Sequence, residues 1–256
     1  MRRVLVIVPF PLDEVGVENR RRQLAGLDFE NVAFDYQPVL AGPATFDSYH
    51  DLLLADVAMC EAGLDAEAQG YDAVCVDTVS DSGVAAMRSV LRIPVVGPGR
   101  ASFVTALMLG SSFSVITVWE PWTLAIKKGI QDAGLAGHCA SVRYTDGTTP
   151  DVRNLLGGKE EDVFPKLLDL ANRCVREDGA DCIILGSTTM HEVHEYLSQR
   201  LDVPVINPGP LSYKVVTMLL DLNLTHGRRT YDSPRVPQQA TFHAMLAAAK
   251  EAAAAG

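Results

Sequence analysis

Two short polar segments, each directly after an apolar run, hold the residues best suited to chemistry in this chain. They read Asp77-Thr78-Val79-Ser80 and Gly186-Ser187-Thr188-Thr189. Helix-forming sequence follows both segments, so their backbone N–H groups and the helix dipole favour a negatively charged oxygen. If the two turns face each other, Thr78 and Ser187 lie on opposite sides of one small anionic ligand.

Hydroxyl groups at these positions need an adjacent base before they can take up a proton at neutral pH. Asp77 could activate Thr78, remove a proton directly or serve the fold alone. His191 could act as an acid or base at the rim of the site, because an imidazole titrates near neutral pH. The alternative for His191 is a solvated helix start. A metal site with His194 lacks a third ligand in the sequence, so we predict no metal.

Both tryptophans of the chain lie in the segment Trp119-Glu120-Pro121-Trp122, which follows another apolar run. Trp119 and Trp122 could form a bulky wall for a ring-shaped substrate, with Glu120 as a further acid/base candidate. Packing beneath a loop is the alternative reading of the two rings.

Several other residues have positions that suggest a structural role. Asp81 lies where the N-cap of the following helix belongs. Arg20 belongs to a run of basic residues that is either a solvated helix face or the source of one guanidinium over the cleft. The Pro98-Gly99 and Pro208-Gly209 pairs predict hinges between halves, with glycine supplying positive φ.

Short apolar runs alternate with helix-length amphipathic stretches along the chain. Several runs are continuous Val/Ile/Leu sequences, which are typical of strands buried on both faces of a parallel sheet. The predicted strands are Val4–Val8, Val32–Tyr36, Ala73–Asp77, Val95–Val96, Ser114–Val118, Cys139–Arg143, Cys182–Leu185 and Val205–Ile206. The predicted helices cover 48–68, 82–91, 101–109, 122–133, 161–178, 192–200, 211–222 and 240–255. This alternation predicts an α/β fold.

An internal repeat links residues 70–99 to residues 179–209. Both segments have the order Gly-x-Asp, strand, polar turn, helix, x-Pro-Val and Pro-Gly. Two related halves facing each other across a pseudo-twofold axis would explain this pattern, and two unrelated βαβ units with similar punctuation are the alternative. In parallel α/β sheets ligands bind beyond the carboxyl ends of the strands, where both polar turns lie.

Composition and charge exclude several classes of protein. The chain has 256 residues, a net charge of −10 and five cysteines. The acidic balance argues against nucleic acid as a partner. Apolar runs are too short for a membrane span or a signal peptide, so we expect a cytoplasmic protein with no membrane partner. The sequence has no Gly-rich nucleotide-binding motif, and we predict no cofactor.

Five segments resemble the aspartate/glutamate racemase superfamily, most closely its hydantoin racemase-like branch. They read GYDAVCVDTVSDSG, IPVVGPG, FSVITVW, GADCIILGSTTM and VPVINPG, and they cover most of residues 70–215 in the family's order. The resemblance implies two similar α/β halves with the active site in the cleft between them. It also implies proton transfer or carbanion handling beside a carboxylate or carbonyl.

The chain departs from the family at the positions that matter most. The family's racemases carry one cysteine after each of the two strands, and Thr78 and Ser187 stand there in this sequence. Two-thiol racemisation is therefore unavailable. Cys75 and Cys182 lie within strands and are interpreted as core residues. The loop after the first strand begins Pro9-Phe10-Pro11 rather than with an Asn-Pro-Asn-Thr-like sequence.

The predicted fold is α/β, with two parallel-sheet halves related by pseudo-twofold symmetry and the active site in the cleft between them. Residues 1–98 plus 208–226 form the first half, 99–207 the second, and 227–256 an arm and an Ala-rich helix, which favour a homo-oligomer. The predicted function is a cofactor-independent enzyme acting on a small carboxylate, hydantoin or cyclic amide by proton transfer next to a carbonyl. A hydrolase or decarboxylase on this scaffold, or a non-catalytic small-acid binder, are the alternatives.

The residues assigned to the site fall into two groups. The catalytic candidates are Thr78, Ser187, His191, Asp77 and Glu120. The substrate-binding candidates are Pro9, Val79, Ser80, Trp119, Trp122, Gly186, Thr188, Thr189 and Pro208.

Overall fold

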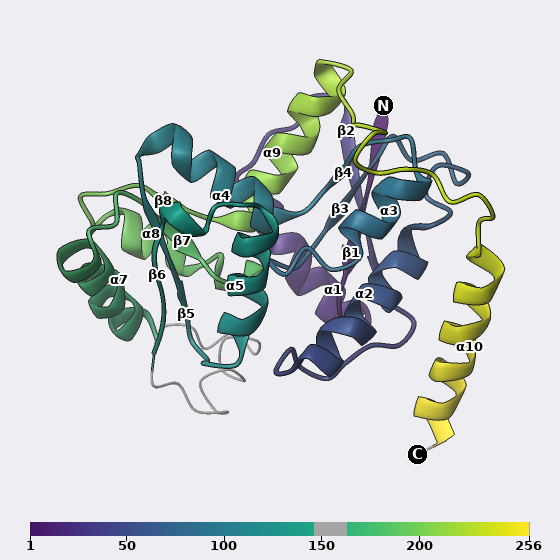
Figure 1. Cartoon of the computed structure of the whole chain (residues 1–256), viewed down its shortest axis with the longest axis horizontal. Helices are drawn as coiled ribbons and strands as arrows, with labels where there is room; N and C mark the ends of the chain where they lie inside the picture. Colours follow the sequence, from purple (N-terminus) through teal and green to yellow (C-terminus); the bar gives the residue numbers. More distant parts are fainter. Residues whose placement is uncertain (146–162, 256) are drawn as a thin grey trace.

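The computed structural model describes residues 1–145 and 163–255 and contains two four-stranded parallel sheets (Figure 1). The first sheet has the order β2-β1-β3-β4 and the second the order β6-β5-β7-β8. The strands are β1 Arg2–Val8, β2 Val32–Pro38, β3 Ala73–Val76, β4 Val95–Val96, β5 Phe113–Thr117, β6 Cys139–Tyr144, β7 Ile183–Leu185 and β8 Val205–Ile206. All eight predicted strands are present, and the equivalent strand order confirms the pseudo-symmetric α/β fold.

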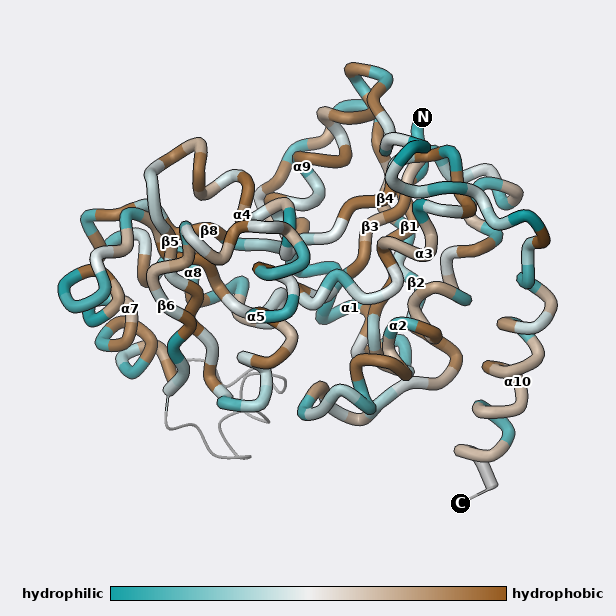
Figure 2. The backbone as a smooth tube through the Cα atoms, viewed as in Figure 1, coloured by the Kyte–Doolittle hydropathy of each residue, from teal (hydrophilic) through white to brown (hydrophobic). Residues whose placement is uncertain are grey.

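Helices follow the strands in both halves and cover the sheet faces. In the described part of the chain they are α1 Glu14–Arg21, α2 Tyr49–Gly63, α3 Val84–Val90, α4 Pro98–Leu109, α5 Trp122–Asp132, α7 Phe164–Asp178, α8 Val193–Ser198, α9 Pro208–Asp221 and α10 Gln239–Ala255. The predicted start of the 161–178 helix lies partly outside the described residues. Figure 2 shows hydrophobic residues along the strands of both sheets, as expected for layers covered on both sides.

The two halves exchange one helix each, and this exchange fixes how they sit together. After β4 the chain enters α4, which packs on β5 and β7 of the second sheet. After β8 it enters α9, which packs back on β3 and β4 of the first sheet, and α4 and α9 pack against each other. Phe103 of α4 stacks on Phe113 of β5, while Tyr213 of α9 hydrogen-bonds Tyr36 of β2.

The Pro-Gly pairs begin these two helices, so the chain crosses between the halves where predicted, but the predicted positive φ of the glycines is wrong. Pro98 and Pro208 occupy the first helical position, where the missing N–H is not needed. Glycine follows each of these prolines because neighbouring atoms leave no room for a side chain. A Cβ on Gly99 would run into the backbone carbonyl oxygen of Val79, and one on Gly209 into the side chain of Gln23.

Asp81 is a helix cap, but for a different helix from the one predicted. Its backbone has a positive φ of 54° and its carboxylate accepts hydrogen bonds from the N–H groups of Gly99 and Arg100, both at 2.8 Å. It therefore caps α4, whereas Gly83 precedes α3 with no side-chain cap. The cap joins the first polar turn to the crossover helix.

The C-terminal helix packs on the first half, at its outer edge (Figure 1). Leu246 of α10 is buried in the core cluster that includes α2 residues. His243 of α10 lies between the carboxylate of Glu61 in α2, 2.7 Å from Nδ1, and that of Asp65 just after α2, 3.0 Å from Nε2. The hydrogen bond that His243 donates to Glu61 raises the pKa of His243 above its ordinary value.

This arrangement predicts a pH-dependent anchor for α10. Because the folded pKa of His243 is raised, its stabilising effect is complete below the ordinary histidine pKa and is lost as the pH rises through the raised value. We expect His243→Gln to lower the thermal midpoint at pH 6 more than at pH 9. Thermal unfolding of both proteins across this range is the measurement, and a difference that does not change with pH would contradict the anchor.

Candidate active site

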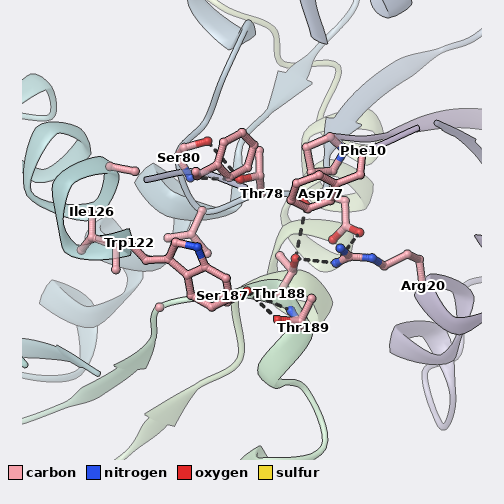
Figure 3. Close-up of a pocket in the computed structure, with 15 residues that line it drawn as sticks. Phe10, Arg20, Asp77, Thr78, Ser80, Trp122, Ile126, Ser187, Thr188 and Thr189 are labelled. Carbon is pink, nitrogen blue, oxygen red and sulfur yellow. Dashed lines mark hydrogen bonds and ion pairs between the residues drawn. The ribbon is translucent and has the colours of Figure 1, made fainter. Parts of the chain in front are cut away.

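A pocket lies between the two halves, at the carboxyl ends of β3 and β7 (Figure 3). Both polar turns predicted from the sequence line it, so the structure brings together the ends that the repeat singled out. The lining residues are Pro9, Phe10, Arg20, Phe46, Asp77, Thr78, Val79, Ser80, Trp122, Ala125, Ile126, Gly186, Ser187, Thr188 and Thr189.

The two turns present the same pair of hydroxyl groups to the pocket. In the first half, Thr78 Oγ1 lies 3.0 Å from Ser80 Oγ. In the second half, Ser187 Oγ lies 2.7 Å from Thr189 Oγ1. The backbone N–H two residues on also donates to the first hydroxyl oxygen in each turn, at 3.4 Å and 3.2 Å. The repeat thus extends from strand order to individual side-chain contacts.

Asp77 lines the pocket, and its carboxylate is engaged by side chains of its own half. Its side chain is 0% exposed, with Oδ2 3.3 Å from Nη1 of Arg20 and Oδ1 accepting from Nε2 of Gln23 at 3.0 Å. The same Arg20 nitrogen donates to Thr188 Oγ1 at 3.3 Å, and Thr188 donates to the carbonyl oxygen of Asp77. This network joins the halves across the pocket and pairs the Asp77 carboxylate with a guanidinium.

His191 and Glu120 lie outside the pocket lining. Burial lowers the pKa of His191, its Nδ1 is buried without a hydrogen-bond partner among the described residues, and its Nε2 is 3.7 Å from Glu192. Glu120 is exposed. The structure therefore places neither side chain against a ligand in the pocket.

Of the two tryptophans, only Trp122 lines the pocket, and Trp119 packs against it edge to face at 6.2 Å. Pro9 lines the pocket as well, while Pro208 is buried at the start of α9 outside the lining. The tryptophan segment thus combines the two proposed roles, since one ring forms a wall and the other supports it.

Four apolar lining residues were missed by sequence reasoning. Phe10 and Phe46 pack against each other with ring centroids 5.3 Å apart, and Ala125 and Ile126 come from α5. Phe46 lies in a segment between elements that carries no periodic pattern. The apolar face of α5 was the available signal for the other two, because it begins at the tryptophan that the sequence singled out.

The cysteines cannot take over the role of the missing thiols. Burial raises the pKa of Cys75 far above its usual range and that of Cys182 to about 12. Both side chains are fully buried in the hydrophobic core. Within residues 1–145 and 163–255, no cluster of His, Cys, Asp or Glu could hold a metal ion. No described helix is long and apolar enough to cross a membrane.

The pocket can therefore donate hydrogen bonds from two facing hydroxyl pairs to a ligand held against an apolar wall. In the described part of the chain, neither the Thr78 nor the Ser187 hydroxyl hydrogen-bonds a carboxylate or an imidazole. Such a site is suited to stabilising a developing negative charge on a carbonyl oxygen.

The chain is similar to known proteins in both sequence and structure. The family model for Asp/Glu/Hydantoin racemase matches residues 18–214. A hydantoin racemase of Pseudomonas sp. (strain NS671) is 30% identical over 221 residues, which cover 86% of each chain. An allantoin racemase from Pseudomonas fluorescens has a TM-score of 0.83 and 26% identity, covering 92% of this chain and 98% of that one.

An allantoin racemase from Klebsiella pneumoniae shares the fold, with a TM-score of 0.83 and 24% identity over 93% of this chain and 95% of its own. The family match spans both polar turns, and the structural similarity spans both halves. The chain belongs to the Asp/Glu/hydantoin racemase family and is an enzyme of the racemase, or isomerase, kind.

Proposed function

We propose that this enzyme inverts the carbon next to a ring carbonyl in a small, uncharged cyclic amide of the hydantoin or allantoin type. Its relatives named for hydantoin and allantoin support this substrate class. The observation that carries the proposal is the charge balance of the pocket. Arg20 and Asp77 are the ionised side chains among its described lining residues, and they pair with each other.

A neutral pocket favours a neutral ligand. A free amino acid or dicarboxylate would need an unpaired cation to replace the water around each carboxylate. The guanidinium of Arg20 already faces the fully buried carboxylate of Asp77, so the positive charge of Arg20 is compensated within the protein. A cyclic amide needs only hydrogen bonds for its ring N–H and carbonyl groups, together with an apolar wall for its ring.

The hydroxyl pairs supply the stabilisation that the reaction needs. When the carbon-bound proton leaves, negative charge moves to the neighbouring carbonyl oxygen as an enolate. The hydroxyls of Thr78 and Ser187 can donate to this oxygen, and the backbone N–H bond that each accepts strengthens it as a donor. The proposal requires no cofactor. Hydrolysis through Ser187 is disfavoured, because its hydroxyl contacts Thr189 rather than a base.

The experiment compares pure enantiomers of 5-substituted hydantoins and of allantoin with L-aspartate and L-glutamate. Chiral chromatography should show loss of enantiomeric purity for the cyclic amides and none for the amino acids. Ser187→Ala should slow this loss about 10²–10³-fold, as the removal of an oxyanion donor does in other enzymes. Ser89→Ala removes an exposed hydroxyl on α3 and is the matched control. Faster racemisation of aspartate or glutamate would overturn the proposal.

A further inference from the structure

A second cavity lies beside the substrate pocket, and Ser80 lines both. The second cavity has a volume of about 290 Å³ and lies between α3 and α5, with Arg100 and Tyr231 also in its wall. A volume of this size with polar walls holds several water molecules. Ser80 is thus the partition between the substrate pocket and a separate polar space.

A continuous row of hydroxyl groups runs through this partition. Thr78 Oγ1 lies 3.0 Å from Ser80 Oγ, which lies 2.9 Å from Ser82 Oγ. Either atom of each pair can be the donor, so the row can carry its protons in both directions. Ser82 is 2% exposed and holds the Ser80 hydroxyl in place from behind.

Two carboxylates in the wall of the second cavity can receive a proton. Asp56 accepts from the Gly83 N–H at 3.0 Å, and Asp81 caps α4. Burial raises the pKa of Asp81 to about 6. A group transfers protons most efficiently when its pKa lies near the operating pH, so this carboxylate is suited to proton transfer near neutral pH. Three cationic side chains line the same cavity as these carboxylates: Arg88, Arg100 and Lys128.

Two of these cationic side chains have other partners. Arg88 donates to the carbonyl oxygen of Val95 and to the hydroxyl of Tyr231. Lys128 pairs with Asp132, the third carboxylate of the cavity. Asp81 accepts backbone N–H groups, not a side-chain cation, in the hydrogen bonds of the described residues. Asp56 is exposed, so its carboxylate is open to water in this cavity.

We propose that Ser80 is a proton-relay residue that connects the catalytic hydroxyl of Thr78 to water and carboxylate in the second cavity. This inference rests on the proposed function and explains how a hydroxyl can replace a thiol. The substrate C–H bond breaks, and its proton goes to Thr78 Oγ1 while its electron pair stays on the substrate as the enolate. The Thr78 proton passes to Ser80 and the Ser80 proton to a cavity water. That water gives a proton to the carboxylate of Asp81 or Asp56. For inversion, Ser187 Oγ gives its proton to the opposite face of the enolate and regains one from solvent water, while the carboxylate releases its proton to the cavity water.

The second half contains only the first link of such a row. Ser187 contacts Thr189 in the same way, but His191 stands at the position equivalent to Ser82 and does not hydrogen-bond Thr189 among the described residues. The described cavity that shares a hydroxyl with the substrate pocket lies on the Thr78 side. The relay is therefore assigned to that side.

The first test removes the Ser80 hydroxyl and measures exchange of the substrate's carbon-bound proton. Ser80→Ala should lower turnover about 10²-fold with little change in KM, because general acid–base transfer contributes about that much. Ser80→Thr keeps the hydroxyl and should retain most of the activity. Rates in H₂O/D₂O mixtures should show several protons in flight for the parent enzyme and fewer for Ser80→Ala. Turnover of Ser80→Ala within twofold of the parent would overturn the relay.

The second test does not depend on any substrate. In Thr78→Cys, the thiol reports on its neighbour through its rate of alkylation by iodoacetamide between pH 6 and 9. Adding Ser80→Ala should slow alkylation at pH 7 by about three- to tenfold, because the thiolate loses a hydrogen-bond donor. Burial raises the pKa of Cys60 and Cys139 to about 11, so these two native thiols should react slowly in this range.

The two tests separate failure of the relay from failure of the proposed function. Equal alkylation rates with and without Ser80→Ala would overturn the relay whether or not a cyclic amide reacts. Absence of exchange with every cyclic amide, combined with slower alkylation, would overturn the proposed function and keep the hydrogen-bonded row.

Discussion

Replacing Thr78 and Ser187 together by cysteine should raise the rate of proton exchange on a cyclic amide by about 10²–10⁴-fold, the usual contribution of general acid–base catalysis. A thiol has an unperturbed pKa near 8.5 and can take up a proton at neutral pH, whereas a hydroxyl cannot. Both positions line the same pocket, and each Oγ accepts a backbone N–H that would stabilise a thiolate. The measurement is the racemisation rate of one hydantoin enantiomer.

The single variants are the controls for this result. Inversion needs a group on each face of the carbon, so Thr78→Cys and Ser187→Cys alone should exchange the proton faster while inverting the centre much less than the pair does. Addition of a thiol-alkylating reagent should remove the gain. If the double variant is no faster than the parent enzyme, then Thr78 and Ser187 do not stand where the substrate reacts.

Breaking the buried ion pair is expected to have the largest effect on stability. Arg20→Met leaves the Asp77 carboxylate, which is 0% exposed, without the cation that faces it. Removal of one partner of a buried pair costs about 3–5 kcal/mol, because the other charge stays buried and uncompensated. We expect the free energy of unfolding to fall by about this amount in chemical denaturation.

The neighbouring residue provides a matched control. Arg21 has a half-exposed side chain and lies 3.6 Å from Glu18 on the helix surface. Arg21→Met should change the free energy of unfolding by no more than about 1 kcal/mol, as is usual for surface pairs. Equal losses for the two variants would contradict the assigned role of Arg20 in joining the halves.

The fold could be predicted from the sequence because its signals are local. Continuous apolar runs such as Val4–Val8 and the 70–99 and 179–209 repeat are visible without knowledge of distant contacts. The predicted helix starts at 101 and 211 were late by three residues each, since Pro98 and Pro208 already begin α4 and α9. Proline was interpreted as a hinge, although it is also favoured at the first helical position.

The turn residues of the site were predicted for the same reason, since the carboxyl ends of parallel strands gather ligands. Contacts between distant residues could not be predicted. Arg20 meets Thr188 across 168 positions, and Asp81 caps a helix that begins 17 residues later rather than its own. Periodicity carries no information about such pairs. The same limit hid Phe46, and it leaves the pairing of Asp77 with Arg20 invisible in the sequence.

We propose that this enzyme moves a carbon-bound proton at a site without thiols. Proton NMR of one enantiomer of a 5-substituted hydantoin in D₂O with the purified enzyme tests this directly. The C5–H signal should disappear as the opposite enantiomer forms, with no new compound and with a large loss of rate in Ser187→Ala. A product of different mass, or inversion without uptake of deuterium, would show that the enzyme does not work by this proton transfer.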